Sequence, residues 1–472
     1  MSPTAELPPA VDVLVVGGGL AGLEVARHLD RAGADVLVVE AGPGEDRRHV
    51  NAAVKPARAE EMWTDVRTDE HYRRPWTSAS GPHFGDGAGL RSRLGGRSLY
   101  WHGVLLPVEE WALREPWWPT AVIDDLTRSW RGGPALYDRV RAELLGPVAP
   151  VPAVDVGGFA LVPPPRAVRF DPVEPERWSA YSPLEHWADD AARAVLACGT
   201  GVAGIEVRDG RARGAVLADG TRVGAERVVL AAGAVESTRL AVQALATTGA
   251  PPVLTGLVDH LVQGFNATVP ADGLPEGRFF RYAPVAGESR SNLFVEGVPN
   301  STGGVELEVW VTGEQVPSAA GEVRCAPDGP WPWPTEVRAG LSAEDTGVVR
   351  AQQDVLGAFW DALCAVQGRP GSALEFGADF LSPVRTLRQV RARLRHDGPG
   401  LTAPVTWASP LGTEDHEGGT LALGAVLDDR HELTAVPGLH AAGPATFPRQ
   451  GAANPSLTTL ALARRLAGVL AG

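Results

Sequence analysis

Three glycines near the start of the sequence have the spacing of a phosphate-binding turn. Gly17, Gly19 and Gly22 form a Gly-x-Gly-x-x-Gly pattern directly after the apolar run Val13–Val16. In such a turn the first glycine permits a tight bend, the second lets the backbone approach a pyrophosphate, and the third lets a following helix pack on the sheet. A second apolar run ends at Glu40, where a carboxylate can accept hydrogen bonds from a ribose. The sequence therefore predicts a dinucleotide-binding βαβ unit.

Near the other end of the chain, His416 and Asn454 carry side chains that can exchange a proton or form hydrogen bonds. A hydride leaves a C–H bond readily only when the attached hydroxyl loses its proton, and a histidine with a pKa near about 6.5 suits a base for that proton. Asn454 could hold the substrate oxygen, although an asparagine before Pro455 is also typical of a helix N-cap. The helix after it would direct its positive end at the negative charge of a reduced flavin. For His416 the alternative is a turn histidine that caps backbone groups.

Length and composition limit the possible functions. A chain of 472 residues is long enough for two lobes. A net charge of −14 argues against a nucleic-acid partner. The three cysteines are odd in number and scattered, which predicts neither a disulfide framework nor a metal site. Because apolar runs are short and the first strand begins close to Met1, we expect a cytoplasmic protein with no membrane partner.

The elements that must position these residues are predicted from turn signals and periodicity. Asp-Gly pairs at 209–210 and 219–220 separate three strand-like runs, a three-stranded meander, ahead of a central strand at 228–230. Alternation in Arg278–Tyr282 and Val305–Val311 favours an antiparallel sheet, and a long helix is predicted over 342–367. The predicted fold class is α/β, with a Rossmann-like domain (parallel sheet plus meander) and a substrate lobe built on an antiparallel sheet with helices. We assign to the first domain residues 1–60, 81–110, 176–250 and 412–472, to a connector 111–175, and to the substrate domain 251–411.

Four segments, in this order, resemble the glucose–methanol–choline (GMC) family of FAD oxidoreductases. They are the N-terminal glycine motif, Gly95–Ser98, Leu230–Ala234 and the closing Asn454–Pro455. The resemblance implies FAD, a discontinuous FAD domain and hydride transfer from an alcohol carbon to flavin N5. It places the catalytic pair at His416, in the family's His-x-x-Gly-Thr pattern, and at Asn454. The residues expected to contact the cofactor are Gly17, Gly19, Leu20, Ala21, Gly22, Glu40, Gly95, Gly96, Ser98, His102, Gly103, Val202, Ala232, Gly233, Gly443, Pro444, Asn454 and Pro455.

The sequence departs from the family pattern in two places. The Arg-Met-Gly that usually follows the histidine motif is replaced by Leu421–Gly424, which leaves the support of the base undefined. Where some relatives carry a flavin-linking histidine, this chain has Tyr100 or Trp101, so FAD is predicted to bind without a covalent link. The Gly-Gly-Arg-Ser segment followed by an aromatic pair is most similar to the pyranose-oxidase branch, which favours a sugar or glycoside hydroxyl as substrate.

Three functions stay open at this point. The presence of His416 favours an FAD-dependent alcohol oxidase or dehydrogenase acting on a sugar, a glycoside or another primary or secondary alcohol. A lyase of the hydroxynitrile-lyase type would keep the fold without net oxidation, and a catalytically silent flavoprotein would keep FAD alone. The sequence names neither the alcohol nor the electron acceptor, which is oxygen or another oxidant.

Overall fold

The computed structural model describes residues 7–146, 151–191, 193–285, 287–377, 380, 385–391 and 403–472, and its first lobe is built on a seven-stranded sheet. The strand order is β12-β2-β1-β15-β14-β13, and β24 also pairs with β15. Strands β12, β2, β1, β15 and β24 are parallel, whereas β13 and β14 are antiparallel. The bounds are β1 Ala10–Val16, β2 Val36–Glu40, β12 Val195–Cys198, β13 Val202–Arg208, β14 Arg211–Leu217, β15 Arg222–Leu230 and β24 Leu439–Ala441. The predicted α/β class is confirmed.

Strand β15 corrects one detail of the predicted meander. The third meander strand and the central strand at 228–230 are one continuous strand. Its beginning pairs antiparallel with β14, whereas most of its length lies parallel to β1, from Ala10 beside Gly224 to Val16 beside Leu230. A hairpin signal locates a turn but does not say where the strand after it ends, and so one strand was predicted as two.

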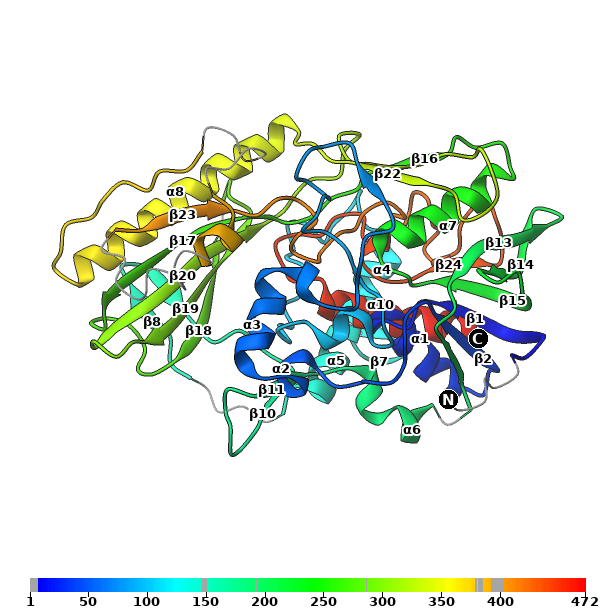
Figure 1. Cartoon of the computed structure of the whole chain (residues 1–472), viewed down its shortest axis with the longest axis horizontal. Helices are drawn as coiled ribbons and strands as arrows, with labels where there is room; N and C mark the ends of the chain where they lie inside the picture. The colour runs from blue at the N-terminus through cyan, green and yellow to red at the C-terminus, as the bar shows by residue number, and fades with distance from the viewer. Residues whose placement is uncertain are drawn as a thin grey trace.

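Helices cover this sheet on both sides, and they explain its unbroken apolar runs. Val13 and Val15 of β1 pack in one core with α1 (Leu20–Arg31) and α10 (Ser456–Ala471), which Figure 1 shows beside the strand. Leu14 and Val16 point the other way, into a core that includes residues of α4 (Thr120–Thr127), α5 (Leu136–Leu144) and α7 (Ala234–Ala246). A strand buried on both faces has no solvated position, so its sequence shows no alternation.

The second lobe is built on a five-stranded antiparallel sheet with the order β18-β19-β20-β17-β23. Helix α8 (Ala343–Val366) packs on its outer face through Leu356, Phe359 and Leu363, at the left of Figure 1. The predicted helix over 342–367 agrees with this, since the Ser342 side chain caps its first turn. The bounds are β17 Leu261–Pro270, β18 Phe279–Val285, β19 Ser291–Pro299, β20 Gly304–Gly313 and β23 Val405–Ala408.

The other face of this sheet turns toward the first lobe and is aromatic. The rings of Phe280, Phe294 and Trp310 stack with centroids 5.4–5.9 Å apart. Phe294 belongs to a small core with Val104 and Ala453, both from the first lobe. The two lobes therefore meet through apolar contacts just before Asn454.

Short helices and strands make up the segments between these two sheets. The connector at 111–175 carries α4, α5 and the short strands β6 (Ser129–Trp130), β7 (Gly133–Pro134), β8 (Val154–Val156), β9 (Phe159–Leu161) and β10 (Val168–Phe170), which pairs with β11 (Trp178–Ala180), although its residues 147–150 lie outside the described ones. After the connector come η3 (Pro183–His186) and α6 (Trp187–Asp190), and residues 195–198 then form the edge strand β12 beside β2. The short strands of the connector pair with their neighbours in sequence, whereas β12 pairs with the distant strand β2.

The remaining described elements are short. A four-stranded sheet joins β16 (Val253–Thr255), β21 (Glu322–Cys325), β22 (Thr335–Arg338) and β4 (Thr77–Ser78). The polar excursion after β2 contains α2 (Val50–Ala53), α3 (Pro56–Thr64) and η1 (Val66–Thr68), followed by β3 (Tyr72–Arg73), β5 (Leu90–Arg91) and η2 (Gly96–Leu99); η4 (Pro444–Thr446) follows β24. None of the helices within the described ranges is long and apolar enough to cross a bilayer.

Candidate active site

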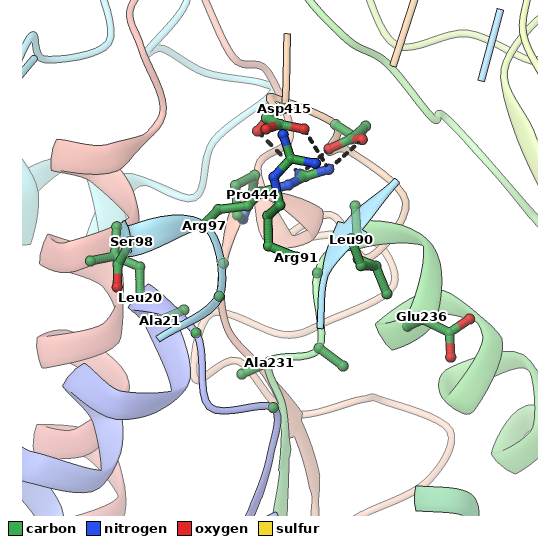
Figure 2. Close-up of a pocket in the computed structure, with 18 of the residues that line it drawn as sticks. Leu20, Ala21, Leu90, Arg91, Arg97, Ser98, Ala231, Glu236, Asp415 and Pro444 are labelled. Atoms are coloured by element: carbon green, nitrogen blue, oxygen red, sulfur yellow. Dashed lines mark hydrogen bonds and ion pairs between the residues drawn. The ribbon is translucent and has the colours of Figure 1, made fainter. Parts of the chain in front are cut away.

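A cavity of about 650 Å³ lies where the N-terminal glycine turn, η2, the turn between β15 and α7, and the C-terminal segment meet. Figure 2 shows Leu20 and Ala21 of α1 close to Ser98 of η2 at this cavity. Its size is within the range of about 300–1,000 Å³ that is usual for small-molecule sites. Fifteen of the predicted cofactor residues line it: Gly17, Gly19, Leu20, Ala21, Glu40, Gly96, Ser98, His102, Val202, Ala232, Gly233, Gly443, Pro444, Asn454 and Pro455.

The N-terminal turn has the geometry that its glycines predict. Gly17 has a φ of +106°, and a Cβ there would lie 2.5 Å from the carbonyl oxygen of Ala231. Gly19 flanks the first turn of α1, and a Cβ there would meet nothing of the described chain within 4 Å, because it would point into open space. Gly22 does not line the cavity, and a Cβ there would lie 2.0 Å from the carbonyl oxygen of Gly17. It is therefore a packing contact between turn and helix.

Glu40 ends β2 at the cavity wall, where it is 9% exposed. Its two carboxylate oxygens accept hydrogen bonds from the backbone N–H groups of Gly18 (2.9 Å) and Gly42 (2.8 Å). Burial raises the pKa of this carboxyl group, and these backbone donors oppose the rise. A carboxylate has about four lone-pair directions, so Glu40 can also accept a ribose hydroxyl.

The second glycine pair ties two loops together. Gly95, with a φ of +93°, donates its backbone N–H to the carbonyl oxygen of Gly18 (2.7 Å), so it supports the first turn without lining the cavity. The hydroxyl of Ser98 lies 2.7 Å from the carbonyl oxygen of Gly95 and 2.8 Å from the hydroxyl of Ser182. Gly103 also lies off the cavity, because it packs on the backbone of Ala167.

His416 lines the cavity and contacts a second histidine. Its Nδ1 lies 2.8 Å from Nδ1 of His260, and the two rings are nearly perpendicular, at 88°. His260 is 1% exposed, and its Nε2 lies 3.0 Å from the carbonyl oxygen of Gly451. Burial lowers the pKa of His416 well below 6.5, and the charges of His260 and Arg97 lower it further. At neutral pH the His416 ring is therefore uncharged and can accept a proton, but it is a weaker base than the imidazole with a pKa of about 6.5 expected from the sequence.

Asn454 lies beside the same cavity, and its helix begins differently from the prediction. Helix α10 begins at Ser456 with Pro455 as the flanking residue, so Pro455 is not the first helical position. The Asn454 side chain does not cap α10, and its buried Oδ1 has no hydrogen-bond partner within the described part of the chain. The expected N-cap role is therefore wrong, and the side-chain oxygen is free for a ligand.

Arg97 contacts the residues on either side of His416, and the sequence did not predict these contacts. Its guanidinium pairs in two places with the carboxylate of Glu417, with one contact of 2.8 Å, and lies 3.0 Å from a carboxylate oxygen of Asp415. It also donates to the carbonyl oxygen of Gly89 (2.8 Å). Figure 2 shows the Arg97 side chain reaching Asp415 across the cavity. The planar guanidinium fork suits this two-point contact, and it fixes the backbone on either side of the base.

Replacing Arg97 by methionine is expected to lower the free energy of unfolding by about 3 kcal/mol, because it leaves the buried carboxylate of Glu417 without its cation. The Glu417 side chain is 2% exposed. The matched control is Arg128→Met, which breaks an exposed pair with Asp124 and should cost about 1 kcal/mol or less. Urea unfolding followed by circular dichroism measures both. Equal losses of unfolding free energy in the two variants would contradict this role of the Arg97–Glu417 pair.

Aromatic rings line the cavity beyond Arg97. The ring centroid of His102 lies 4.5 Å from that of Trp63 and 5.7 Å from that of Trp178. Burial lowers the pKa of His102 to about 3, so this ring is neutral. Tyr100, one of the two residues proposed for the position of a linking histidine, is 3% exposed, and its hydroxyl accepts a hydrogen bond from Arg93 (3.2 Å).

These features fit a flavin dinucleotide. The open space above Gly19 and the first turn of α1 suit a pyrophosphate, and Glu40 suits a ribose. The unpartnered Oδ1 of Asn454 and the start of α10 lie at the same cavity as His416, where a ring with hydrogen-bonding edges would find partners. Within the described ranges, His, Cys, Asp and Glu form no group that could hold a metal ion.

The sequence did not predict three residues of the site, because their contacts form only in the tertiary structure. Arg97 lies within the Gly95–Ser98 segment, and Glu417 fills a variable position of the His-x-x-Gly-Thr pattern, so neither motif indicates that the two residues pair. His260 stands 156 positions before His416, directly before β17, within no recognised motif. Only a three-dimensional arrangement brings these residues together.

Comparison with known proteins supports the cofactor assignment. Residues 12–88 match a family described as FAD dependent oxidoreductase, and residues 317–463 match the family described as GMC oxidoreductase. Curated proteins show no significant sequence match. Among solved structures, pyridoxine 4-oxidase from Mesorbium loti is similar over 97% of this chain and 98% of its own, with 18% identity and a TM-score of 0.60. Formate oxidase from Aspergillus oryzae is similar over 99% of each chain, with 15% identity and a TM-score of 0.63.

The two matches include the N-terminal turn and the C-terminal segment of the cavity, whereas η2 and the turn between β15 and α7 lie between the matched ranges. At these sequence identities the solved structures establish only a shared fold. The evidence for the cofactor comes from the two family matches. The cofactor is FAD. Residues 317–463 therefore belong to the glucose–methanol–choline (GMC) oxidoreductase family, and residues 12–88 to a family of FAD-dependent oxidoreductases, as the ordered motifs of the sequence predicted.

Proposed function

We propose that this protein oxidises a small alcohol to a carbonyl compound, with His416 as the general base and Asn454 as the residue that positions the substrate. The observation that best supports this proposal is that the imidazole of His416 and the free amide oxygen of Asn454 line one cavity together with the Gly17–Gly22 turn. An oxidation of CH–OH needs a proton acceptor and a hydride acceptor at the same carbon, and this cavity is suited to hold both.

His416 receives the hydroxyl proton on Nε2, the ring nitrogen that does not face His260. Its neutral state at physiological pH is the state that a base needs, and general-base help contributes about 10²–10⁴ in rate. The amide of Asn454 holds the substrate oxygen and so fixes the reacting carbon. FAD, when bound, supplies the acceptor for the hydride. The alcohol thus loses a proton and a hydride, and a carbonyl remains.

The residues around the cavity favour a class of alcohol. The Gly-Gly-Arg-Ser segment with its aromatic neighbours favours a sugar or glycoside hydroxyl, and other primary or secondary alcohols fit the same chemistry. Arg73, Arg74 and Glu414 offer polar partners on the cavity wall, while Trp63 and Trp101 offer flat apolar ones. Such a mixture of polar and aromatic groups is suited to hydroxyls on a ring. Oxygen or another oxidant would then take up the electrons.

Anaerobic mixing of the purified holoprotein with a panel of sugars, glycosides and cyclic alcohols tests the proposal. Loss of the flavin absorbance at about 450 nm, the usual flavin band, identifies a substrate, and product analysis identifies the oxidised carbon. If no alcohol reduces the flavin, a lyase or a silent flavoprotein becomes the better description. Release of a carbonyl compound without any bleaching would favour the lyase.

We further propose that FAD is bound without a covalent link. The sequence offers Tyr100 or Trp101 where some relatives attach the flavin; Trp101 has no nucleophilic side chain, and burial raises the pKa of Tyr100 above the ordinary value of 10.0, so its hydroxyl stays protonated. Acid precipitation of the holoprotein is expected to leave the yellow flavin in the supernatant. Flavin that stays with the pellet after washing in denaturant would contradict this expectation.

A further inference from the structure

The contact between His260 and His416 determines which nitrogen of each ring carries the proton. A backbone carbonyl oxygen only accepts hydrogen bonds, so the His260 Nε2 that lies 3.0 Å from the Gly451 oxygen must carry a hydrogen. His260 is 1% exposed, and burial lowers its pKa to about 4, so its ring is neutral and has one hydrogen only. Its Nδ1 is therefore a bare lone pair.

That lone pair then settles the state of His416. Two bare nitrogens at 2.8 Å would repel each other, so Nδ1 of His416 carries the hydrogen and donates it to Nδ1 of His260. A neutral His416 has one ring hydrogen, which leaves its Nε2 unprotonated. The hydrogen bonds from His260 to the Gly451 oxygen and from His416 to His260 thus fix the tautomer of the His416 ring.

We propose that His260 is a positioning residue that holds His416 in the tautomer with an unprotonated Nε2, ready to accept the substrate proton. This inference rests on the proposed function, because it assigns a purpose to a base. It also explains how His416 is supported in a chain that lacks the family's Arg-Met after the histidine motif.

The same residue joins the two halves of the proposed catalytic pair. Gly451 stands three positions before Asn454, and its backbone N–H also donates to the buried carboxylate of Glu314 (3.2 Å). The next residue, Ala452, donates its N–H to Glu109 (2.9 Å). His260 therefore contacts a loop that two carboxylates hold in place. Because His260 also contacts His416, it fixes the position of His416 relative to the loop that carries Asn454.

The direct test is the nitrogen spectrum of the histidine rings in the holoprotein. Uniform ¹⁵N-histidine labelling and long-range ¹H–¹⁵N correlation distinguish protonated from unprotonated ring nitrogens, and the His416 signals are assigned by their absence in His416→Asn. We expect His416 protonated at Nδ1 and bare at Nε2, and His260 the reverse. A proton on Nε2 of His416 would overturn the proposal, and this readout needs no substrate.

Two variants of His260 separate its two contacts. His260→Gln places an amide near the position of Nε2 and keeps the link to Gly451, whereas His260→Asn places an amide oxygen near Nδ1 and keeps an acceptor for His416. We expect the glutamine variant to slow anaerobic flavin reduction by about 10- to 100-fold through kcat rather than KM, and the asparagine variant to lose less. The opposite ranking, at equal FAD content, would overturn the positioning role. Absence of reduction in the wild type would instead refute the proposed function, with the nitrogen spectrum still decisive for the tautomer.

Discussion

His416→Asn is expected to slow the anaerobic reduction of bound FAD by about 10²–10⁴-fold at pH 7, because it removes the only ring nitrogen proposed to take the hydroxyl proton. Asparagine retains a polar group near the position of Nδ1, so the contact toward His260 survives and the loss reports on Nε2. FAD content should not fall, since Gly17, Gly19 and Glu40 line the part of the cavity that suits the dinucleotide. Stopped-flow measurement of the reduction rate constant at saturating alcohol gives the effect on the chemical step.

His440→Asn is the matched control for this experiment. His440 lies on β24, is buried at 6% exposure and does not line the cavity. Its replacement should change stability more than the reduction rate. If His416→Asn reduced its flavin as fast as the wild type while His440→Asn did the same, the base would have to be another group, and the neutral ring of His102 would be the next candidate at this cavity.

The parts of the site that could be predicted are those coded by neighbouring residues. The turn from Gly17 to Gly22 needs positive φ and close backbone approach, requirements that only glycine meets, so its position is legible in the sequence. Strand periodicity likewise predicted the antiparallel sheet, and helical periodicity predicted α8. In these cases a local rule and the tertiary structure agree.

The parts that could not be predicted depend on which distant segments meet. Asparagine is a residue type typical of an N-cap, but the loop before Asn454 is held by Glu109 and Glu314. The helix begins later, at Ser456, and the Asn454 Oδ1 has no partner within the described part of the chain. Arg97 and His260 reach the His416 segment from 319 and 156 positions away in chain order. Buried hydrogen bonds of this kind depend on the fold, and sequence spacing carries no record of them.

Gly17→Ala is expected to yield largely FAD-free protein, because two independent penalties act on the same residue. A residue with a side chain is strained at the φ of +106° that Gly17 adopts, at a cost of about 1–3 kcal/mol. In addition, the new Cβ would lie 2.5 Å from the carbonyl oxygen of Ala231 and 2.8 Å from Cα of Ala232, both backbone atoms that cannot rotate away. The turn between β1 and α1 would have to move from the turn between β15 and α7, and both turns line the cavity.

If the turn of the Gly17→Ala variant relaxes in the FAD-free protein, binding of FAD must return it to the strained conformation. This strain alone is then expected to weaken the affinity for FAD by about 5- to 150-fold. Titration of the apoprotein with FAD, followed by flavin fluorescence, measures this loss. Gly210→Ala separates strain from collision, since Gly210 has a φ of +71° in the hairpin between β13 and β14, and a Cβ there meets nothing of the described chain within 4 Å. That variant should lose some stability and keep its FAD. Equal FAD affinity in Gly17→Ala and the wild type would mean that the first glycine of the turn does not shape the dinucleotide site, and the close approach of Ala231 to Gly17 would then serve the packing of the sheet alone.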